Sequence, residues 1–388
     1  MSSRNPIVVL GGGISGLACT FYLNKLARNV IGNRKIILLE GSKRLGGWLE
    51  TKTCEDGVLH ELGPRSIRFN GTMGMNTISL IEEVGLGRDL LGKQSLKSRY
   101  IYAENKLNKL PSGFSGILRK QKPLLPKSLL RYAISEYRKP KLVIPDTEDI
   151  SVYDFIAKRF DTHFANYFAD PLLRGVTAGD ARKLSMKSLF PEIYEKQVNA
   201  GSVTRGYLKG FPFEAIKHVN YDVSDLALDA KTKRWQTFNL REGLASLPEA
   251  MSEYLIRQPN VQICNESQVK SIEFNKDGVP AIITVKSAAE QEEITLDADY
   301  VISALPANRL APILPSDISS IATKLKNIDW VNVGVVCLEY EGKKIIPEDF
   351  GFGYLVPSFE HSKLLGVTFD SCVFPEHDKR KVTRMTVS

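Results

Sequence analysis

Near the N-terminus the sequence reads Ile7-Val8-Val9-Leu10-Gly11-Gly12-Gly13-Ile14-Ser15-Gly16. Consecutive apolar residues followed by glycines are typical of a buried strand that enters a tight turn. The apolar residues of 17–26 are then spaced as in a helix, and 35–40 reads as a second buried strand that ends in Glu40. This part of the chain therefore predicts a β-α-β unit.

The glycines and the acid of this unit predict a dinucleotide site. Gly11 would make the tight turn, Gly13 would let the backbone approach a pyrophosphate, and Gly16 would let the helix pack on the strand. The helix N-terminus would face the phosphates with free N–H groups and a partial positive charge. Glu40 would accept hydrogen bonds from the ribose hydroxyls of an adenosine and would repel a 2′-phosphate, so NADP is disfavoured. A glycine-rich turn alone is common, and the strand, helix and acid in register are what favour a dinucleotide.

The choice between NAD and FAD depends on Arg44-Leu45-Gly46-Gly47-Trp48, a few positions after Glu40. A second glycine pair suits another close approach of the backbone to a long cofactor, and Arg44 would be available to a phosphate. A plain NAD domain would start its next helix here. We therefore predict FAD and an α/β fold with an FAD-type doubly wound domain.

Composition and charge limit the function classes that remain. With 388 residues and 43% hydrophobic content, the chain can form two or three domains with sizeable cores. The net charge of +8 points to an acidic substrate, an anionic membrane surface or nucleic acid, with a solvated basic surface as the alternative. The widely separated cysteines form no Cys/His cluster of ligand spacing, so we expect neither a disulfide framework nor a metal site.

Targeting and membrane-spanning segments are not predicted. The first strand starts soon after Met1, so we expect no signal peptide or cleavable presequence. No window offers the roughly 18 apolar residues of a membrane span. Any membrane association would therefore be peripheral or monotopic.

The segment 114–141 is the most basic part of the chain. Its basic residues are Arg119, Lys120, Lys122, Lys127, Arg131, Arg138, Lys139 and Lys141, against the single acid Glu136. Basic residues interleaved with leucines suit the headgroup region of an anionic bilayer, where each Lys or Arg contributes about 1 kcal/mol. A solvated charged face is the alternative. Nucleic acid is disfavoured, because neither stacking aromatics nor a recognisable module is evident.

A hairpin is predicted for 53–62, with Asp56-Gly57 at its turn. The loop Gly63-Pro64-Arg65-Ser66-Ile67-Arg68 follows it and presents two arginines. The loop is either an ordinary surface turn or, beside a flavin, a lining loop whose Arg65 meets a developing negative charge.

Together with the residues before it, this loop resembles the protoporphyrinogen oxidase family, the flavoenzymes of haem synthesis. The resemblance is carried by 60–68 and by 44–48. It continues in the family's order through 99–102, 110–113, 173–180, 184–185, 240–244, 301–307 and 351–358. It covers essentially 7–387. It implies oxygen-dependent oxidation of protoporphyrinogen IX to protoporphyrin IX, with FAD as electron acceptor and hydrogen peroxide as by-product.

The resemblance also implies which residues form the site. Arg99 matches the arginine that binds a propionate, Leu172 and Phe352 match apolar wall residues, and the backbone carbonyl of Gly175 would polarise a pyrrole N–H. Ordinary core packing is the alternative for Leu172 and Phe352. The residues assigned to FAD are Gly11, Gly12, Gly13, Ile14, Ser15, Gly16, Glu40, Gly41, Arg44, Gly47, Trp48, Gly63, Pro64, Arg65, Ser66 and Val269.

The resemblance divides the chain into three domains. An FAD-binding domain would comprise 1–75 and 241–306, and a helical membrane-associating domain would be inserted at 98–200. A substrate-binding domain with a mainly antiparallel sheet would comprise 76–97, 201–240 and 307–388. The mitochondrial inner membrane is the implied location, with peripheral or monotopic attachment through 114–141. A homodimer and a contact with ferrochelatase stay open.

The sequence pattern predicts the elements of the later segments. Residues 151–194 read as helical, and 261–306 as strands with turns at 275–278 and 288–290. The strand within 300–306 is expected to return to the sheet of the cofactor domain. Three more strands are expected at 331–340, 353–356 and 364–374.

One departure from the family concerns the C-terminal side. The family continues past the strand that here reads Arg384-Met385-Thr386-Val387, whereas this sequence stops at Ser388. We expect the section that follows in the family to complete the FAD domain. Without it we expect an unpaired sheet edge, an open apolar face and impaired catalysis. The alternatives are a truncated, impaired flavoprotein and a related flavin amine oxidase or carotenoid desaturase.

Overall fold

The computed structural model describes residues 5–26, 32, 34–94, 98–145, 147–210, 223–274, 281–287, 293–342, 345–347 and 350–388. Contacts divide the chain into two compact units. Unit 1 comprises Met1–Gln94 and Asp222–Trp330, and unit 2 comprises Ser95–Tyr221 and Val331–Ser388. The division into three domains stays a prediction.

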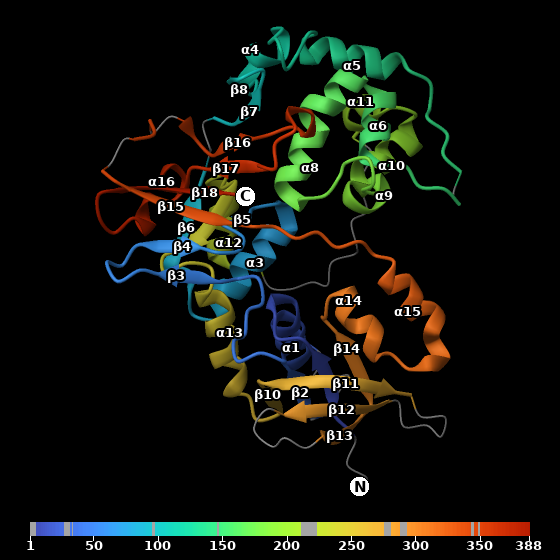
Figure 1. The fold of residues 1–388 in the computed structure, drawn as a ribbon, viewed down its shortest axis with the longest axis vertical. Helices are drawn as coiled ribbons and strands as arrows, with labels where there is room; N and C mark the ends of the chain where they lie inside the picture. The colour runs from blue at the N-terminus through green and yellow to red at the C-terminus, as the bar shows by residue number, and fades with distance from the viewer. Residues whose placement is uncertain are drawn as a thin grey trace. The chain divides into compact units, whose positions relative to one another are not determined.

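The core of unit 1 is a parallel sheet of four strands in the order β10-β2-β1-β14 (Figure 1). β1 (Ile7–Leu10) lies between β2 (Ile36–Leu39) and β14 (Tyr300–Ser303), and β10 (Val261–Cys264) pairs with β2. The helix α1 (Ile14–Leu26) connects β1 to β2. The predicted β-α-β unit and the predicted return of 300–306 to this sheet are confirmed.

The side chains of β1 alternate between two cores. Ile7 and Val9 pack with α1 and with α13 (Ser246–Ile256) on one face of the sheet. Val8 and Leu10 pack on the other face against an antiparallel sheet formed by β11 (Ser267–Glu273), β12 (Ala281–Ser287) and β13 (Glu293–Ala298). Because both faces are covered, β1 is apolar at every position.

The predicted strands within 261–306 are confirmed as β10 to β14. The predicted turns at 275–278 and 288–290 lie outside the described residues.

The other elements of unit 1 include the predicted hairpin, formed by β3 (Thr51–Thr53) and β4 (Leu59–Glu61). A small sheet has the order β5 (Ile67–Arg68), β9 (Thr237–Leu240) and β6 (Leu90–Lys93). The helices are α3 (Gly71–Glu83), η1 (Gly87–Asp89), α12 (Asp225–Thr232), α14 (Ala307–Leu310), η3 (Ala311–Ile313), η4 (Ser316–Ile318) and α15 (Ser319–Lys326).

Unit 2 contains a six-stranded sheet. Its order is β15 (Val336–Glu341), β18 (Val382–Val387), β17 (Gly366–Thr368), β16 (Gly353–Leu355), β7 (Tyr100–Ala103) and β8 (Lys106–Lys109). All neighbours are antiparallel except β16 and β7. The prediction of a mainly antiparallel sheet in this part of the chain is therefore confirmed.

Two predictions about this sheet need correction. The strand predicted for 364–374 ends at Thr368, and the short helix α16 (Asp370–Val373) follows, where Asp370 and Ser371 accept hydrogen bonds from Thr386 Oγ1 and Arg384 N. The strand predicted for 331–340 begins only at Val336. β18, which contains 384–387, is hydrogen-bonded to β15 on one side and β17 on the other, so the expected unpaired edge is not found at this strand.

The rest of unit 2 is helical. The helices are α4 (Gly113–Leu118), α5 (Leu129–Arg138), α6 (Val152–Arg159), α7 (Thr162–Phe164), η2 (Ala165–Ala169), α8 (Asp170–Thr177), α9 (Met186–Leu189), α10 (Pro191–Ala200), α11 (Val203–Leu208), η6 (Ser358–Glu360) and η7 (Pro375–His377). The helical prediction for 151–194 is confirmed. Among the described residues, no helix combines the length and apolar character needed to cross a bilayer.

A buried carboxylate ties three of these helices together. Glu136, in the last turn of α5, is 0% exposed. Arg159 of α6 donates to it from Nε (2.7 Å) and from Nη2. Ser202 Oγ (2.6 Å) and the backbone N–H groups of Val203 (2.9 Å) and Thr204 (2.8 Å), at the start of α11, donate to the same carboxylate. Burial alone would raise the pKa of Glu136, but the hydrogen bonds from Ser202, Thr204 and Arg159 outweigh burial and hold this pKa below its ordinary value.

Replacing Glu136 with Gln should destabilise unit 2 by roughly 3–5 kcal/mol, because Arg159 would keep a buried charge without its counterion. The folded pKa lies below the unfolded one, so the stabilisation is fully present above the ordinary carboxyl pKa. It is lost as pH falls through the folded pKa. Denaturant unfolding at neutral and at acidic pH measures both effects, and the difference from wild type should shrink in acid.

Glu195→Gln, at an exposed position of α10, is the matched control. Equal unfolding midpoints for the two variants at neutral pH would contradict a stabilising role for Glu136.

Candidate active site

The glycine turn after β1 packs backbone on backbone. Gly11 has φ +99°, and a Cβ at Gly16 would lie 1.8 Å from the carbonyl oxygen of Gly11. A Cβ at Gly12 would lie 2.4 Å from the Leu45 side chain. Gly13 is different, because the nearest atom to a Cβ there would be 3.9 Å away. The turn is therefore closed by α1 on one side and open at Gly13, where a ligand backbone or phosphate can approach.

The second glycine pair is attached to this turn. Gly46 N donates to Gly12 O (2.9 Å), and Gly13 and Gly46 form a parallel bridge. The guanidinium of Arg44 binds its own loop, donating to Leu45 O (3.1 Å), Gly47 O (2.6 Å), Leu49 O (2.9 Å) and Glu50 Oε2 (3.1 Å). Arg44 thus fixes the shape of the loop. A contact of Arg44 with a phosphate stays a prediction.

The carboxylate of Glu40 is oriented by the same turn. Its Oε2 accepts from Gly12 N (2.7 Å), and its Oε1 accepts from Ser42 N and Ser42 Oγ (2.8 Å each). Oε2 keeps a further lone pair for a hydroxyl donor, whereas Oε1 already accepts from two donors. Sequence reasoning missed Ser42, although a hydroxyl two residues after a carboxylate is a recognisable local anchor.

The loop 63–66 packs on Trp48, the residue that follows the second glycine pair. A Cβ at Gly63 would lie 1.8 Å from Trp48 O, so only glycine allows this approach. From β9, Asn239 Nδ2 donates to Arg65 O (2.8 Å) and to Glu61 Oε1 (3.1 Å). Sequence reasoning missed Asn239, because its partners are far away along the chain and no local pattern indicates it.

The N–H groups of the Arg65 guanidinium indicate whether the site suits a flavin. Arg65 Nε and Nη2 are buried and have no hydrogen-bond partner within the described residues, and Nη1 makes only a 3.4 Å contact with Gly63 O. Buried donors are costly unless an acceptor meets them. Orphaned donors on a loop that packs on Trp48 fit an acceptor-rich ligand such as a flavin.

The remaining predicted cofactor residues lie on the same elements. Ile14 and Ser15 begin α1, and Gly41 follows β2. Ser267 N donates to Glu40 O (2.8 Å), which brings β11 and Val269 next to the end of β2. Trp48 and Pro64 are exposed, and Ser66 is half-buried. The structure thus gathers the predicted cofactor residues at the carboxyl end of β1 and β2, where ligands of parallel sheets bind.

In unit 2, the structure brings Arg99 and Phe352 together. Phe352 N donates to Ser98 O (3.0 Å), immediately before the parallel pairing of Tyr100 with Tyr354. Arg99 is exposed and Phe352 is half-buried. The two side chains therefore come from adjacent strand ends of one sheet.

The helix α8 packs against this sheet through Gly175. A Cβ at Gly175 would lie 2.2 Å from Leu355 Cδ2 on β16, so a larger residue here would require the Leu355 side chain or the helix to shift. Leu172 and Val176 on the same helix are 47% and 72% exposed. Leu172 is therefore not an ordinary core residue of this unit.

The carbonyl of Gly175 is an open acceptor. Ala178 ends the helix with φ +53°, and Gly179 N donates to Thr177 Oγ1 (3.0 Å). No described residue donates a hydrogen bond to Gly175 O. Unit 2 thus presents a cation, apolar side chains and an unused backbone acceptor on neighbouring elements.

Comparison with known proteins assigns the family. The family described as flavin containing amine oxidoreductase matches residues 14–388. The chain belongs to this family. The protoporphyrinogen oxidases of Bos taurus and Homo sapiens are each 35% identical to it over 376 residues, which are 96% of this chain and 74% of each relative. The resemblance to protoporphyrinogen oxidases is confirmed, and the protein is a flavin-dependent oxidase.

Solved structures agree on the fold. A crystal structure from Exiguobacterium sp. 255-15, provisionally named a protoporphyrinogen oxidase, superimposes with a TM-score of 0.70 at 23% identity. The match covers 100% of this chain and 77% of that one. The predicted α/β fold of the FAD-dependent type is confirmed.

Gly16→Ala should abolish most of the flavin binding, because its methyl group would push α1 away from the turn at Gly11. The flavin absorbance of the purified protein measures the loss, and its thermal unfolding shows whether the fold survives. Gly334→Ala is the matched control, since a Cβ there would have nothing within 4 Å. Flavin content equal to that of Gly334→Ala would contradict the role of the Gly11–Gly16 contact.

Proposed function

We propose that this protein oxidises protoporphyrinogen IX to protoporphyrin IX, with FAD as the electron acceptor and oxygen as the final oxidant. The observation that carries the proposal is the 35% identity to protoporphyrinogen oxidases over 96% of the chain. FAD, when bound, supplies the acceptor for the hydride removed from the substrate. The protein has to hold the cofactor, orient the substrate and satisfy the charges of both.

Unit 1 offers separate sites for the parts of FAD. The open backbone at Gly13 and the N-terminus of α1 suit the pyrophosphate. Glu40, held by Gly12 and Ser42, suits the ribose hydroxyls. The orphaned N–H groups of Arg65 suit an acceptor that gains negative charge on reduction. FAD is favoured over NAD because the second glycine loop lies against the first turn.

Unit 2 offers the groups that a tetrapyrrole with propionates requires. Arg99 would pair with a propionate, and Leu172 and Phe352 would contact the rings. The free carbonyl of Gly175 would accept a pyrrole N–H and so orient the ring whose carbon loses hydride. In support of these roles, Arg99 adjoins Phe352 on one sheet, and α8 presents Leu172 beside Gly175.

The proposed reaction is tested by supplying protoporphyrinogen IX to the flavin-loaded protein and following porphyrin fluorescence. Fluorescence should rise with turnover, and hydrogen peroxide should appear with it. Oxidation of an amine without porphyrin formation would contradict the proposal and favour a related amine oxidase.

Arg99→Ala should raise KM for protoporphyrinogen about 10–100-fold, because a charge-assisted hydrogen bond contributes roughly 1.5–3 kcal/mol. The change in kcat should be smaller, and Arg99→Lys should restore part of the affinity. Lys109→Ala, at an exposed position on the neighbouring strand β8, is the control. A KM equal to the control's would remove Arg99 from the substrate site.

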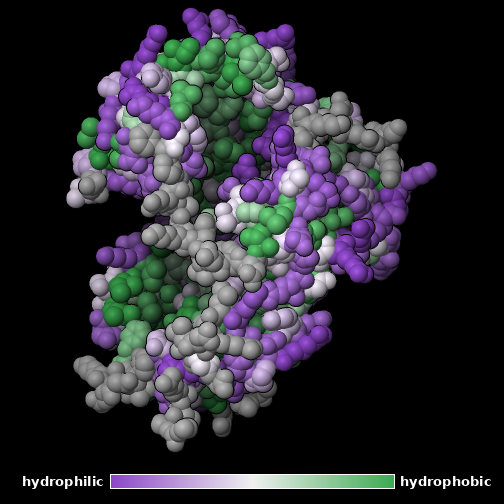
Figure 2. Space-filling view, turned by 180° about the vertical axis from the view of Figure 1, so that it is seen from behind, coloured by the Kyte–Doolittle hydropathy of each residue, from purple (hydrophilic) through white to green (hydrophobic). Residues whose placement is uncertain are grey.

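We also propose peripheral attachment of unit 2 to an anionic membrane through 114–141. On α5, Leu130, Ile134 and Tyr137 are each more than two-fifths exposed and lie on one helical face. On α4, Phe114 is 78% exposed, and Ile117 and Leu118 are also exposed. Figure 2 shows hydrophobic and hydrophilic residues side by side over the end of unit 2 that carries these helices. Exposed apolar residues beside basic ones suit the headgroup region of a bilayer.

The structure also distinguishes among the basic residues of 114–141. Lys127 forms an ion pair with Asp161 (2.9 Å) and lies over the ring of Tyr132. Within the described part of the chain, Lys120, Arg131 and Arg138 have no such partner. These three residues are therefore better candidates than Lys127 for contact with an anionic surface.

Replacing Lys120, Arg131 and Arg138 with Ala together should weaken binding to phosphatidylserine vesicles, by up to about 1 kcal/mol for each residue. The loss should shrink as salt is raised, since salt screens surface charges. Vesicle co-sedimentation measures binding. The control neutralises the same number of exposed lysines in unit 1, Lys231, Lys324 and Lys326. Equal loss in both variants would show that net charge, rather than this segment, governs binding.

A further inference from the structure

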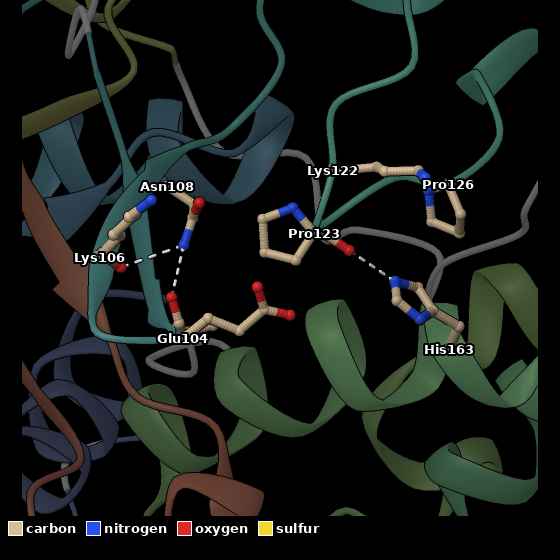
Figure 3. A pocket seen from close by; sticks show the side chains of 8 residues that line it. Glu104, Lys106, Asn108, Lys122, Pro123, Pro126 and His163 are labelled. Atoms are coloured by element: carbon tan, nitrogen blue, oxygen red, sulfur yellow. Dashed lines mark hydrogen bonds between the residues drawn. The ribbon is translucent and has the colours of Figure 1, made fainter.

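A pocket of about 450 Å³ opens in unit 2, and none of its lining residues is assigned above to cofactor or substrate. It lies between the hairpin of β7 and β8, the loop that joins α4 to α5, and α7 (Figure 3). Its lining residues are Ala103, Glu104, Lys106, Asn108, Lys122, Pro123, Pro126 and His163.

Hydrogen bonds between the three elements hold the walls of the pocket. Gln121 Nε2 donates to Lys109 O (2.7 Å) and so joins the loop to the hairpin. Nε2 of His163 lies 2.8 Å from Pro123 O, which joins the loop to α7, and the His163 ring stacks on Tyr167 at 4.3 Å. The pocket is therefore a preformed feature of the unit.

The pocket carries groups of both charges. Lys106 and Lys122 are exposed and form no ion pair with any residue that the structure describes. The Glu104 carboxylate contributes a negative charge to the pocket. It accepts a long hydrogen bond (3.5 Å) from Tyr167. Glu360 is the other acid nearby, and its Oε1 accepts from Glu104 N (2.9 Å).

An uncharged acceptor lies beside these groups. The amide nitrogen of Asn108 donates to Ala103 O (2.9 Å) and Lys106 O (3.0 Å), with a longer contact to Ile101 O (3.4 Å). No described residue donates to its Oδ1. Figure 3 shows Asn108, Glu104 and Pro123 around the same space. The pocket thus combines ammonium groups with a carboxylate and an amide acceptor.

We propose that this pocket binds the headgroup of phosphatidylethanolamine. The phosphate would meet Lys106 and Lys122, and the primary ammonium would donate to Glu104 and to Asn108 Oδ1. A primary ammonium has three hydrogen-bond donors, whereas the trimethylammonium of phosphatidylcholine has none. The pocket would therefore distinguish these two zwitterionic lipids.

The position of the pocket favours a lipid over a soluble ligand of the same chemistry. Its loop runs directly from α4, where Phe114 is 78% exposed, to α5, where Leu130 is 43% exposed. A headgroup in the pocket would have apolar side chains on the helices at both ends of this loop to contact its acyl chains. The inference rests on the proposed membrane attachment of unit 2.

The test compares two vesicle preparations with the same phosphatidylserine content. In the first preparation, the remaining lipid is phosphatidylcholine. In the second preparation, half of that phosphatidylcholine is replaced by phosphatidylethanolamine. Wild type should bind the second preparation about ten- to a hundredfold more tightly, as expected for a charge-assisted hydrogen bond. Glu104→Gln and Lys122→Ala should lose this preference. Lys120→Ala, in the same basic segment but outside the pocket, should bind both preparations less tightly and keep the preference.

The outcomes separate the pocket from membrane attachment. Equal binding of wild type to both preparations would overturn the headgroup site and leave membrane attachment standing. A preference that persists in Glu104→Gln and Lys122→Ala would show that lipid packing, rather than the pocket, causes it. If no vesicle binds, the site is tested by measuring the unfolding temperature with soluble headgroups. Glycerophosphoethanolamine should raise the unfolding temperature of wild type but not that of Glu104→Gln. Glycerophosphocholine should raise neither. Absence of that difference would also overturn the site.

Discussion

The close contact between Gly16 and the carbonyl of Gly11 is the constraint on which the cofactor half of the molecule depends. With no side chain between them, α1 starts immediately against the end of β1. That position frees the N–H groups at the start of the helix and leaves Gly13 open. It also places Gly12 N within 2.7 Å of Glu40 at the end of β2. The second glycine pair then attaches to the same turn through Gly12 O, and the Arg65 loop packs on Trp48, the residue after that pair. A single close backbone approach thus organises several loops around one sheet edge.

The sequence predicted the parts of this arrangement that depend on neighbouring residues. The period of apolar residues and the glycine spacing predicted β1, α1 and β2, and Asp56-Gly57 predicted the hairpin. The bonds from Asn239 to the Arg65 loop and the packing of Gly175 on Leu355 could not be predicted, because their partners lie more than a hundred residues apart. The strand predicted for 364–374 ends early for a related reason. Its residues suit a strand, but beyond Thr368 the chain forms α16, whose Asp370 and Ser371 bind Thr386 and Arg384 of β18.

The basic segment shows how burial changes the meaning of a charge count. Glu136 is the single acid of 114–141, and by sequence alone it offsets one of the surface cations. In the structure it is buried and neutralised by Arg159, which lies outside the segment. Lys127 is paired with Asp161, also outside it. The segment 114–141 contains no other acid to offset its remaining basic residues, which lie next to the exposed apolar faces of α4 and α5. That combination is more typical of an interfacial helix pair than of a solvated charged face.

Glycines in the two units help to present backbone groups of opposite polarity, N–H groups in unit 1 and a carbonyl in unit 2. In unit 1 the glycine turn brings backbone N–H groups to a helix N-terminus, where an anion is stabilised. In unit 2 Gly175 brings the C-terminal half of α8 against β16, and no donor among the described residues meets the Gly175 carbonyl beside the helix end at Ala178. A helix C-terminus carries partial negative charge, so this carbonyl favours an N–H donor. A side chain at Gly175 would meet the end of the Leu355 side chain, so either that side chain or α8 would have to shift. The close packing at Gly175 therefore influences where this backbone oxygen lies.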